Sequence, residues 1–144
     1  MAFDFIALRG TFFDNAGMMR RADKMKRKQL SKFGAFVRKR MRSSMRRRKK
    51  QSKPGEPPSA HSGELKLIFF AWDDRQQSVV VGPIIFSVRD GGGITPGLLE
   101  RGGERIARRR GRSKRLHYRK FPFAVPALEA EAPKFAGLFK GAFS

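Results

Sequence analysis

Hydrophobic positions near the start of the chain recur at the spacing of an α-helix. The steps between them are three to five residues, and most of the intervening side chains are Lys or Arg. Asp14 or Asn15 can cap the start, because a short side-chain oxygen accepts a hydrogen bond from a free N–H group of the first turn. The pattern predicts a long basic helix over residues 14–50 with one narrow apolar face, on which Gly34 marks close packing or a bend. The apolar positions are Met18, Ala22, Met25, Leu30, Phe33, Val37, Met41 and Met45.

A proline-rich segment follows the helix over residues 51–63. Pro54, Pro57 and Pro58 fix φ and lack an N–H donor, so we expect an extended arm here. The segment is long for an ordinary connection, which suggests that it lies against another surface.

Residues 64–123 are expected to form a small antiparallel sheet. Residues 65–72 and 78–86 are rich enough in β-branched and aromatic side chains for two strands, and residues 73–77 between them predict a turn. Pro83 lacks the N–H that a strand ladder needs, so the second strand should lie at an edge or contain a bulge.

The part of this region after residue 94 has a different pattern. A short helix over residues 95–100 should end at Gly102 and Gly103, at least one of which should have a positive φ. The basic stretch 101–120 has little apolar periodicity, so we expect a flexible loop that leads into a short strand around residues 118–123.

The last segment, residues 124–144, predicts a helix followed by a short tail. Leu128 and Phe135 belong to an apolar stripe on this helix, and Pro133 should kink the helix or divide it in two. The sequence thus predicts one α+β domain over residues 1–144, with a long basic N-terminal helix, a small antiparallel β-sheet with a hairpin, and a C-terminal helix.

The charge of the chain says more about its binding partners than the predicted fold does. The chain has 33 Lys and Arg against 12 Asp and Glu, a net charge of +21. Residues 20–50 hold 16 of these basic side chains and residues 101–120 another 10. Such an excess implies an anionic partner, which is nucleic acid, an acidic protein surface or anionic lipid. The longest apolar run, residues 67–72, is far shorter than the roughly 20 residues that span a bilayer, so we expect no membrane partner.

Genomic double-stranded DNA and an acidic protein remain the two candidate partners of the basic side chains. Lys and Arg bind phosphates without reading sequence, and the affinity falls steeply with salt. The candidate contact residues are Arg38, Lys39, Arg42, Arg46, Arg47, Arg48, Lys49, Lys50, Arg108, Arg109, Arg110 and Arg112.

Catalytic chemistry has few candidates in this sequence. There is no Cys, and the two histidines, His61 and His117, lie in segments without a nucleophile motif. Asp73 and Asp74 are adjacent carboxylates in an expected turn, where Asp most often serves as a turn former. We therefore expect no catalytic residue, no metal site, no cofactor and no enzymatic activity.

Four short patches occur in an order that resembles a known family. They are His-Ser-Gly-Glu-Leu at 61–65 after the proline-rich arm, Ser-Val-Val-Val-Gly-Pro at 78–83, Pro-Gly-Leu-Leu-Glu-Arg-Gly-Gly at 96–103, and the stretch 118–128 with Phe-Pro-Phe-Ala-Val-Pro-Ala-Leu. Together they resemble the neck or tail-component (tail-completion-like) proteins of long-tailed bacteriophages. The resemblance marks these positions as assembly or structural motif residues: Gly63, Gly82, Pro83, Leu99, Gly102, Gly103, Pro122, Phe123, Pro126 and Leu128.

The resemblance implies a structural virion protein at the head–tail junction, assembled in the cytoplasm of the bacterial host. It implies a homo-oligomeric ring, sixfold or twelvefold, stacked between head-closure or connector proteins and the tail tube or tail terminator. A basic ring on the exit path of the genome could hold the DNA end. The alternative is a stand-alone basic nucleic-acid-binding protein of ribosomal or architectural type. The two basic blocks, taken alone, agree with this alternative as well.

Overall fold

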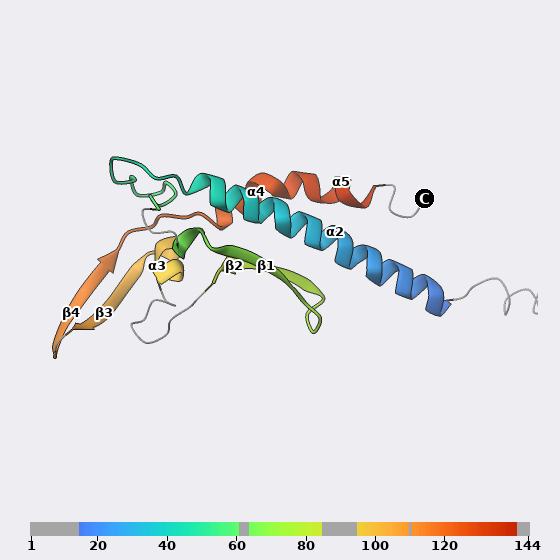
Figure 1. Cartoon of the computed structure of the whole chain (residues 1–144), viewed down its shortest axis with the longest axis horizontal. Coiled ribbons are helices and arrows are strands. Elements are labelled where there is room, and N and C mark those ends of the chain that lie inside the picture. Colours follow the sequence, from blue (N-terminus) through green and yellow to red (C-terminus); the bar gives the residue numbers. More distant parts are fainter. Residues whose placement is uncertain (1–14, 61–63, 85–94, 110, 141–144) are drawn as a thin grey trace, which may run out of the picture.

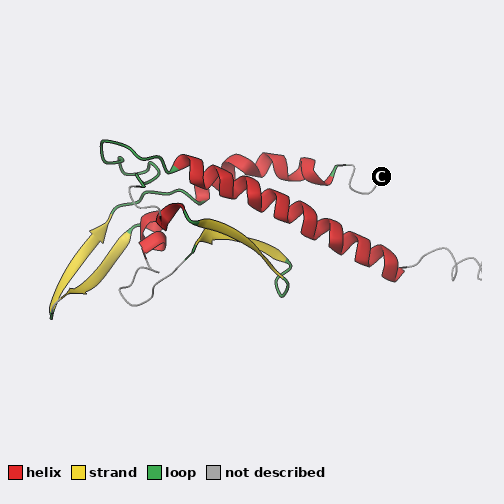
Figure 2. Ribbon diagram, viewed as in Figure 1, coloured by secondary structure: helices red, strands yellow, loops and turns green. Residues whose placement is uncertain are grey.

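The computed structural model describes residues 15–60, 64–84, 95–109 and 111–140 and has an α+β fold, as predicted (Figure 1). One long helix has a β-hairpin along it and the C-terminal helices beside it, and a second hairpin extends beyond its C-terminal end (Figure 2). In chain order the elements are α2 (Asn15–Ser44), the 3-10 turn η1 (Glu64–Lys66), β1 (Ile68–Asp73), β2 (Ser78–Pro83), α3 (Thr95–Arg101), β3 (Gly103–Arg109), β4 (Arg112–Tyr118), α4 (Val125–Glu131), η3 (Ala132–Lys134) and α5 (Phe135–Phe139).

Helix α2 is shorter than the sequence predicted. It ends at Ser44, so residues 46–50 are not helical as the range 14–50 required. The hydroxyls of Ser43 and Ser44 donate to the carbonyls of Arg40 and Met41 at 2.9 and 2.8 Å, and so occupy acceptors of the last turn. Repulsion among the consecutive cations that follow disfavours another turn.

The proline-rich arm turns back across the end of α2. In its described part, residues 51–60, it has no regular structure, as expected. The N–H of Gly55 donates to the carbonyl of Lys120 at 2.9 Å, and the Ser59 hydroxyl accepts from the N–H of Arg48 at 3.0 Å. Ala60 is buried in the core. The arm thereby joins the end of α2 to the segment that precedes α4.

The first hairpin is the one that the sequence predicted. Strands β1 and β2 pair antiparallel, from Ile68 opposite Pro83 to Asp73 opposite Ser78. A carboxylate oxygen of Asp73 accepts from the N–H groups of Arg75 and Gln76 at 2.9 and 3.2 Å, which is the turn-forming role expected of this residue. Strand β2 ends at Pro83, and residues 85 and 86 of the predicted strand lie outside the described residues.

A second hairpin stands where a flexible loop was expected. Strands β3 and β4 pair antiparallel, so the described residues form two two-stranded sheets rather than one small sheet. The predicted strand around residues 118–123 is wrong, since β4 ends at Tyr118. A run of arginines hid the two strands, and the turn signal was the single Gly111, whose φ of 75° suits a tight hairpin connection.

The corner between α3 and β3 follows the prediction for its glycines. Gly102 and Gly103 have φ of 75° and 137°. The N–H of Gly102 donates to the carbonyl of Leu98 at 2.8 Å, which closes the last turn of α3 in the way that a left-handed residue ends a helix. Farther along, η3 separates α4 from α5 at Pro133, so the predicted division of the C-terminal helix is confirmed.

The core is small and gathers on one stripe of α2. Chain segments far apart in sequence meet there, because β1, β2 and α4 all pack on the same face of the helix. Among the described residues, the buried apolar side chains are Val37, Met41, Met45, Ala60, Ile68, Phe123 and Ala127. Phe33, Leu65, Val81, Leu99 and Ala124 pack against them while remaining partly exposed.

Gly34 allows the β1–β2 hairpin to approach α2. A Cβ at this position would lie 2.5 Å from Cγ1 of Val79, a branched side chain with little freedom to turn away. Replacing Gly by Ala in a helix interior ordinarily stabilises by about 1 kcal/mol. For Gly34→Ala we expect the opposite sign, a loss of about 1–2 kcal/mol in the free energy of unfolding measured with urea, because the tightly packed sheet must move.

Gly137→Ala in α5 is the matched control, since a Cβ there meets nothing within 4 Å. This variant should be as stable as the wild type or slightly more stable. Equal gains for both variants would show that the hairpin does not sit closely on α2.

Candidate assembly groove and basic surfaces

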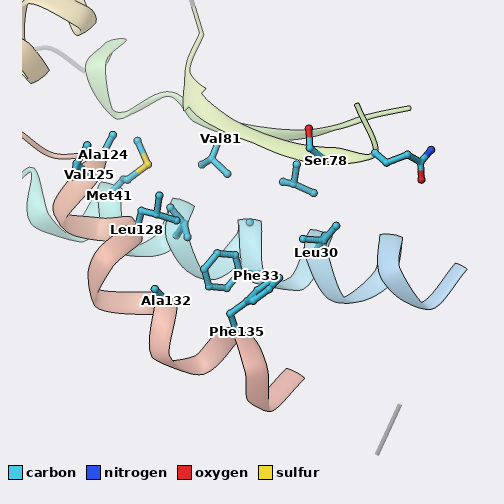
Figure 3. Close-up of a pocket in the computed structure, with 14 residues that line it drawn as sticks. Leu30, Phe33, Met41, Ser78, Val81, Ala124, Val125, Leu128, Ala132 and Phe135 are labelled. Carbon is cyan, nitrogen blue, oxygen red and sulfur yellow. The ribbon is translucent and has the colours of Figure 1, made fainter. Parts of the chain in front are cut away.

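An apolar groove opens between α2, the β1–β2 hairpin and the C-terminal helices. It has a volume of about 640 Å³ (Figure 3). Helix α2 contributes Leu30 and Phe33, strand β2 contributes Val81, and Leu128 and Phe135 come from α4 and α5. Figure 3 shows the aromatic rings of Phe33 and Phe135 meeting at one side of the groove and Val81 above it.

The chemistry of this groove is that of a binding surface. Among the described residues that line it, Gln77 and Ser78 are the polar ones, and none has a titratable side chain. Its apolar side chains remain partly open to solvent, with 49% of Leu128 and 37% of Phe135 exposed. The groove can therefore bury apolar side chains of a partner.

Two sets of contacts hold the C-terminal helices against α2 and so fix the width of the groove. The rings of Phe33 and Phe135 pack edge to face with centroids 5.0 Å apart. The carboxylate of Glu131, only 4% exposed, accepts from Nε of Arg40 at 2.7 Å and from Nζ of Lys134 at 2.6 Å. Lys134 first and Arg40 second lower the pKa of Glu131, because both stabilise its charged form more than burial disfavours it.

Glu100 connects two of the four sequence patches. Its carboxylate accepts from the N–H groups of Phe123, Ala124 and Val125 at 2.8, 3.0 and 2.8 Å. These groups stand at the start of α4, whose own N-cap residue, Ala124, makes no side-chain cap. The patch at 96–103 thereby anchors the patch at 118–128.

This role of Glu100 was not predicted from the sequence. A signal existed, because Ala-Val-Pro at the start of the predicted helix contains no Ser, Thr, Asp or Asn to cap it. An uncapped helix start indicates that another part of the chain supplies the acceptor.

Most of the predicted motif residues support the fold rather than lining a surface. Phe123 is buried in the core, and Leu99 packs against the core while its carbonyl accepts from the N–H of Phe121 at 2.7 Å. Gly82 and Pro83 pair with β1, Pro122 is half-buried, and Pro126 is exposed in the first turn of α4. Leu128 lies in the groove, and Gly63 is outside the described residues.

Several cations of the first basic block serve the fold. Nε of Arg38 donates to the carbonyl of Ile68 at 2.7 Å, and its guanidinium lies 5.3 Å from the ring centre of Phe69. Arg48 pairs with Glu56 at 2.7 Å and lowers the pKa of that carboxyl, after the larger effect of a hydrogen bond from the Lys53 N–H. Both arginines were predicted to contact a partner, and both are occupied within the chain.

The other predicted cations of this block lie nearer to solvent. Lys39 and Arg42 border a shallow polar hollow on the flank of α2, and both are exposed. Arg46, Arg47, Lys49 and Lys50 are exposed on the chain that follows the helix.

The second basic block forms the β3–β4 hairpin. Arg108 and Arg112 are exposed on it, Arg109 is the last residue of β3, and Arg110 lies outside the described residues. Glu104 contacts Arg115 at 3.8 Å and His117 at 3.7 Å. This hairpin and the arm after α2 lie at the same end of the molecule, where Gly55 bonds to Lys120 (Figures 1 and 2).

Within the described ranges, no cluster of three or more His, Asp or Glu side chains is arranged to hold a metal ion. No helix in the part of the chain that the structure describes is long and apolar enough to cross a membrane. Comparisons with protein-family models, curated proteins and solved structures returned no match.

Removing the acceptor at the start of α4 should loosen the groove. Glu100→Gln retains the shape of the side chain but loses its charge and one acceptor oxygen, so we expect the free energy of unfolding to fall by about 1–3 kcal/mol. Urea denaturation followed by circular dichroism measures this. Glu104→Gln, on the exposed hairpin, is the control and should change the stability by less than about 0.5 kcal/mol. Equal effects of the two changes would contradict the role of Glu100 as a helix cap.

The contacts of Glu131 predict a pH dependence. Because the folded-state pKa of Glu131 is lowered below its ordinary value of 4.5, its stabilising effect is complete above that pH and is lost as the pH falls through the folded pKa. Glu131→Gln should therefore unfold more easily than the wild type at pH 7, and the difference should shrink at acid pH. Glu129→Gln, exposed on the same helix, should match the wild type throughout. A difference between Glu131→Gln and the wild type that does not change with pH would contradict this assignment.

Proposed function

We propose that this protein is a structural subunit of the head–tail junction of a long-tailed bacteriophage. Copies of it form a ring, sixfold or twelvefold, between head-closure or connector proteins and the tail tube or tail terminator. The observation that carries this proposal is the apolar groove, because it leaves unburied the kind of surface that subunits bury against one another.

The distribution of apolar residues supports a subunit that completes itself by association. The buried core of the described residues is small and is centred on one stripe of α2, while Leu128, Val125 and Phe135 are between 37 and 52% exposed around the groove. Each square ångström of apolar surface removed from water contributes roughly 25 cal/mol. A neighbouring copy that fills the groove would gain this contribution.

The shape of the chain supports the same proposal. The N-terminal half of α2 extends past the turn of the β1–β2 hairpin (Figure 1), and Met18 and Met19 on it are more than half exposed. A helix with little cover of its own gains most from packing against a neighbouring copy.

The contact of Glu100 with the start of α4 gives a physical reason why two of the four sequence patches occur together. Patches 96–103 and 118–128, which resemble the phage neck proteins, meet through the three hydrogen bonds to this carboxylate. The contact gives this chain a structural reason to hold the two patches at their spacing. The second candidate, a stand-alone nucleic-acid-binding protein, is favoured by the projecting basic hairpin.

Oligomeric state in high salt separates the two candidates. High salt removes association through nucleic acid but retains association through apolar surface. We expect the wild type to give one ring-sized mass by light scattering, and closed rings by electron microscopy. A monomer under these conditions would favour the stand-alone protein, and genes for portal and tail-tube proteins beside this gene would favour the neck.

Leu128→Glu tests whether the groove is the contact between copies. A charge in the groove should reduce the ring to monomers, because burying an unpaired carboxylate against a neighbour is costly. Circular dichroism should be unchanged, since Leu128 is half exposed and Glu is a good helix former. Val80→Glu adds the same charge to an exposed apolar position that does not line the groove, and it should assemble normally. Rings of unchanged mass from Leu128→Glu would place the interface elsewhere.

A further inference from the structure

The β3–β4 hairpin projects from the rest of the molecule. Each strand has 7 residues, which gives a ribbon about 23 Å long. Figures 1 and 2 show it leading away from α2 and from the other hairpin. Its two strands pack chiefly on each other, and most of its described side chains are exposed.

Positive charge covers both faces of this ribbon. In an antiparallel pair, residues opposite each other point to the same side, and successive residues alternate between the sides. The register pairs Arg108 with Ser113 and Ile106 with Arg115, so Arg108 and Arg115 share one face. Arg105, Arg112 and Lys114 share the other.

The ribbon carries more like charge than it can neutralise. Arg108 and Arg115 are diagonal neighbours across the strands, Arg112 and Lys114 are neighbours on the same face of β4, and like charges at such positions repel. Glu104 is the one acidic residue of the two strands, and its contacts are with Arg115 and His117 in the half nearer the body. An anionic partner at the outer half would relieve the repulsion.

We propose that the β3–β4 hairpin binds double-stranded DNA by entering the major groove, with each face directed at one of the two flanking phosphate backbones. The major groove of B-DNA is about 12 Å wide and admits a two-stranded β-ribbon. Contacts to phosphates on both sides bind without reading sequence. The inference concerns one element of the chain and holds whether the protein is a ring or a monomer.

The chemistry of the ribbon favours duplex DNA over the other anionic partners. An acidic protein surface would meet one face of a ribbon, whereas this ribbon is cationic on both faces. Single strands are bound by stacking on aromatic rings, and Tyr118, at the base, is the aromatic residue of the two strands apart from His117. Duplex RNA has a major groove too narrow and deep for such an element.

The test compares two triple variants that each remove three positive charges. Arg108→Gln/Arg112→Gln/Lys114→Gln neutralises the outer half of the ribbon. Arg20→Gln/Lys24→Gln/Lys28→Gln neutralises three exposed positions of α2 at the opposite end of the molecule. Binding of full-length protein to a labelled DNA duplex is measured by fluorescence anisotropy over a series of salt concentrations, and again with duplex RNA of the same sequence and with polyglutamate.

For the wild type we expect tighter binding to duplex DNA than to duplex RNA at equal salt. The ribbon variant should lose that preference, and its slope of log affinity against log salt should flatten by about 0.9 for each phosphate that it no longer neutralises, or roughly 2.7 in all. The α2 variant should retain both the preference and nearly the full slope. Circular dichroism should show both variants folded, because the ribbon variant has less internal repulsion than the wild type.

Three results would overturn the proposal. Equal flattening in the two variants would show that net charge alone governs binding. Equal affinity of the wild type for DNA and RNA would rule out insertion into the major groove. Equal weakening of DNA and polyglutamate binding in the ribbon variant would make the hairpin a docking site for acidic proteins.

Discussion

The packing of the first hairpin and of the C-terminal helices depends on one narrow apolar stripe on α2. The buried residues of that stripe are Val37, Met41 and Met45. They pack with Ile68 from the first hairpin and with Phe123 from the segment before α4. Lys and Arg occupy most of the remaining surface of the helix, so no second element can pack on its far side without burying charge. The stripe is too narrow to bury all the apolar side chains that pack against it. The apolar groove is where these side chains remain exposed. The small core and the open groove are two results of the same constraint.

The sequence predicted the parts of the fold that depend on periodicity. The apolar spacing along α2, the first hairpin and the break at Pro133 all follow from patterns that one segment carries alone. Prediction from the sequence failed where charge masked the pattern, as in the β3–β4 hairpin. Its strands hold five arginines and few large apolar residues, and their pairing is set by a turn at Gly111. Prediction also failed at the end of α2, where two serine hydroxyls and a run of cations stop a helix that composition alone would have continued.

The candidate site residues, too, were predicted only in part from the sequence. The motif residues were predicted as a group, but their task within the chain could not be, because Glu100 and the N–H groups that it accepts from are more than 20 residues apart. Arg38 and Arg48 were expected to contact a partner from charge alone. In the structure Arg38 donates to a carbonyl of the first hairpin, and Arg48 pairs with Glu56, eight residues farther along the chain. Net charge predicts that an anionic partner exists, and only the packing of the chain decides which cations are available to meet it.

The placement of Phe123 and Ala127 in the core bears on how the chain folds during synthesis. They follow Met41 by roughly 80 residues, so the contact between them closes a long loop and belongs to the slow, non-local class. A ribosome releases the stripe of α2 long before it releases Phe123 and Ala127, which complete its cover. Nascent chains therefore expose Val37 and Met41 throughout most of translation, which makes chaperones and early aggregation relevant to the yield of this protein.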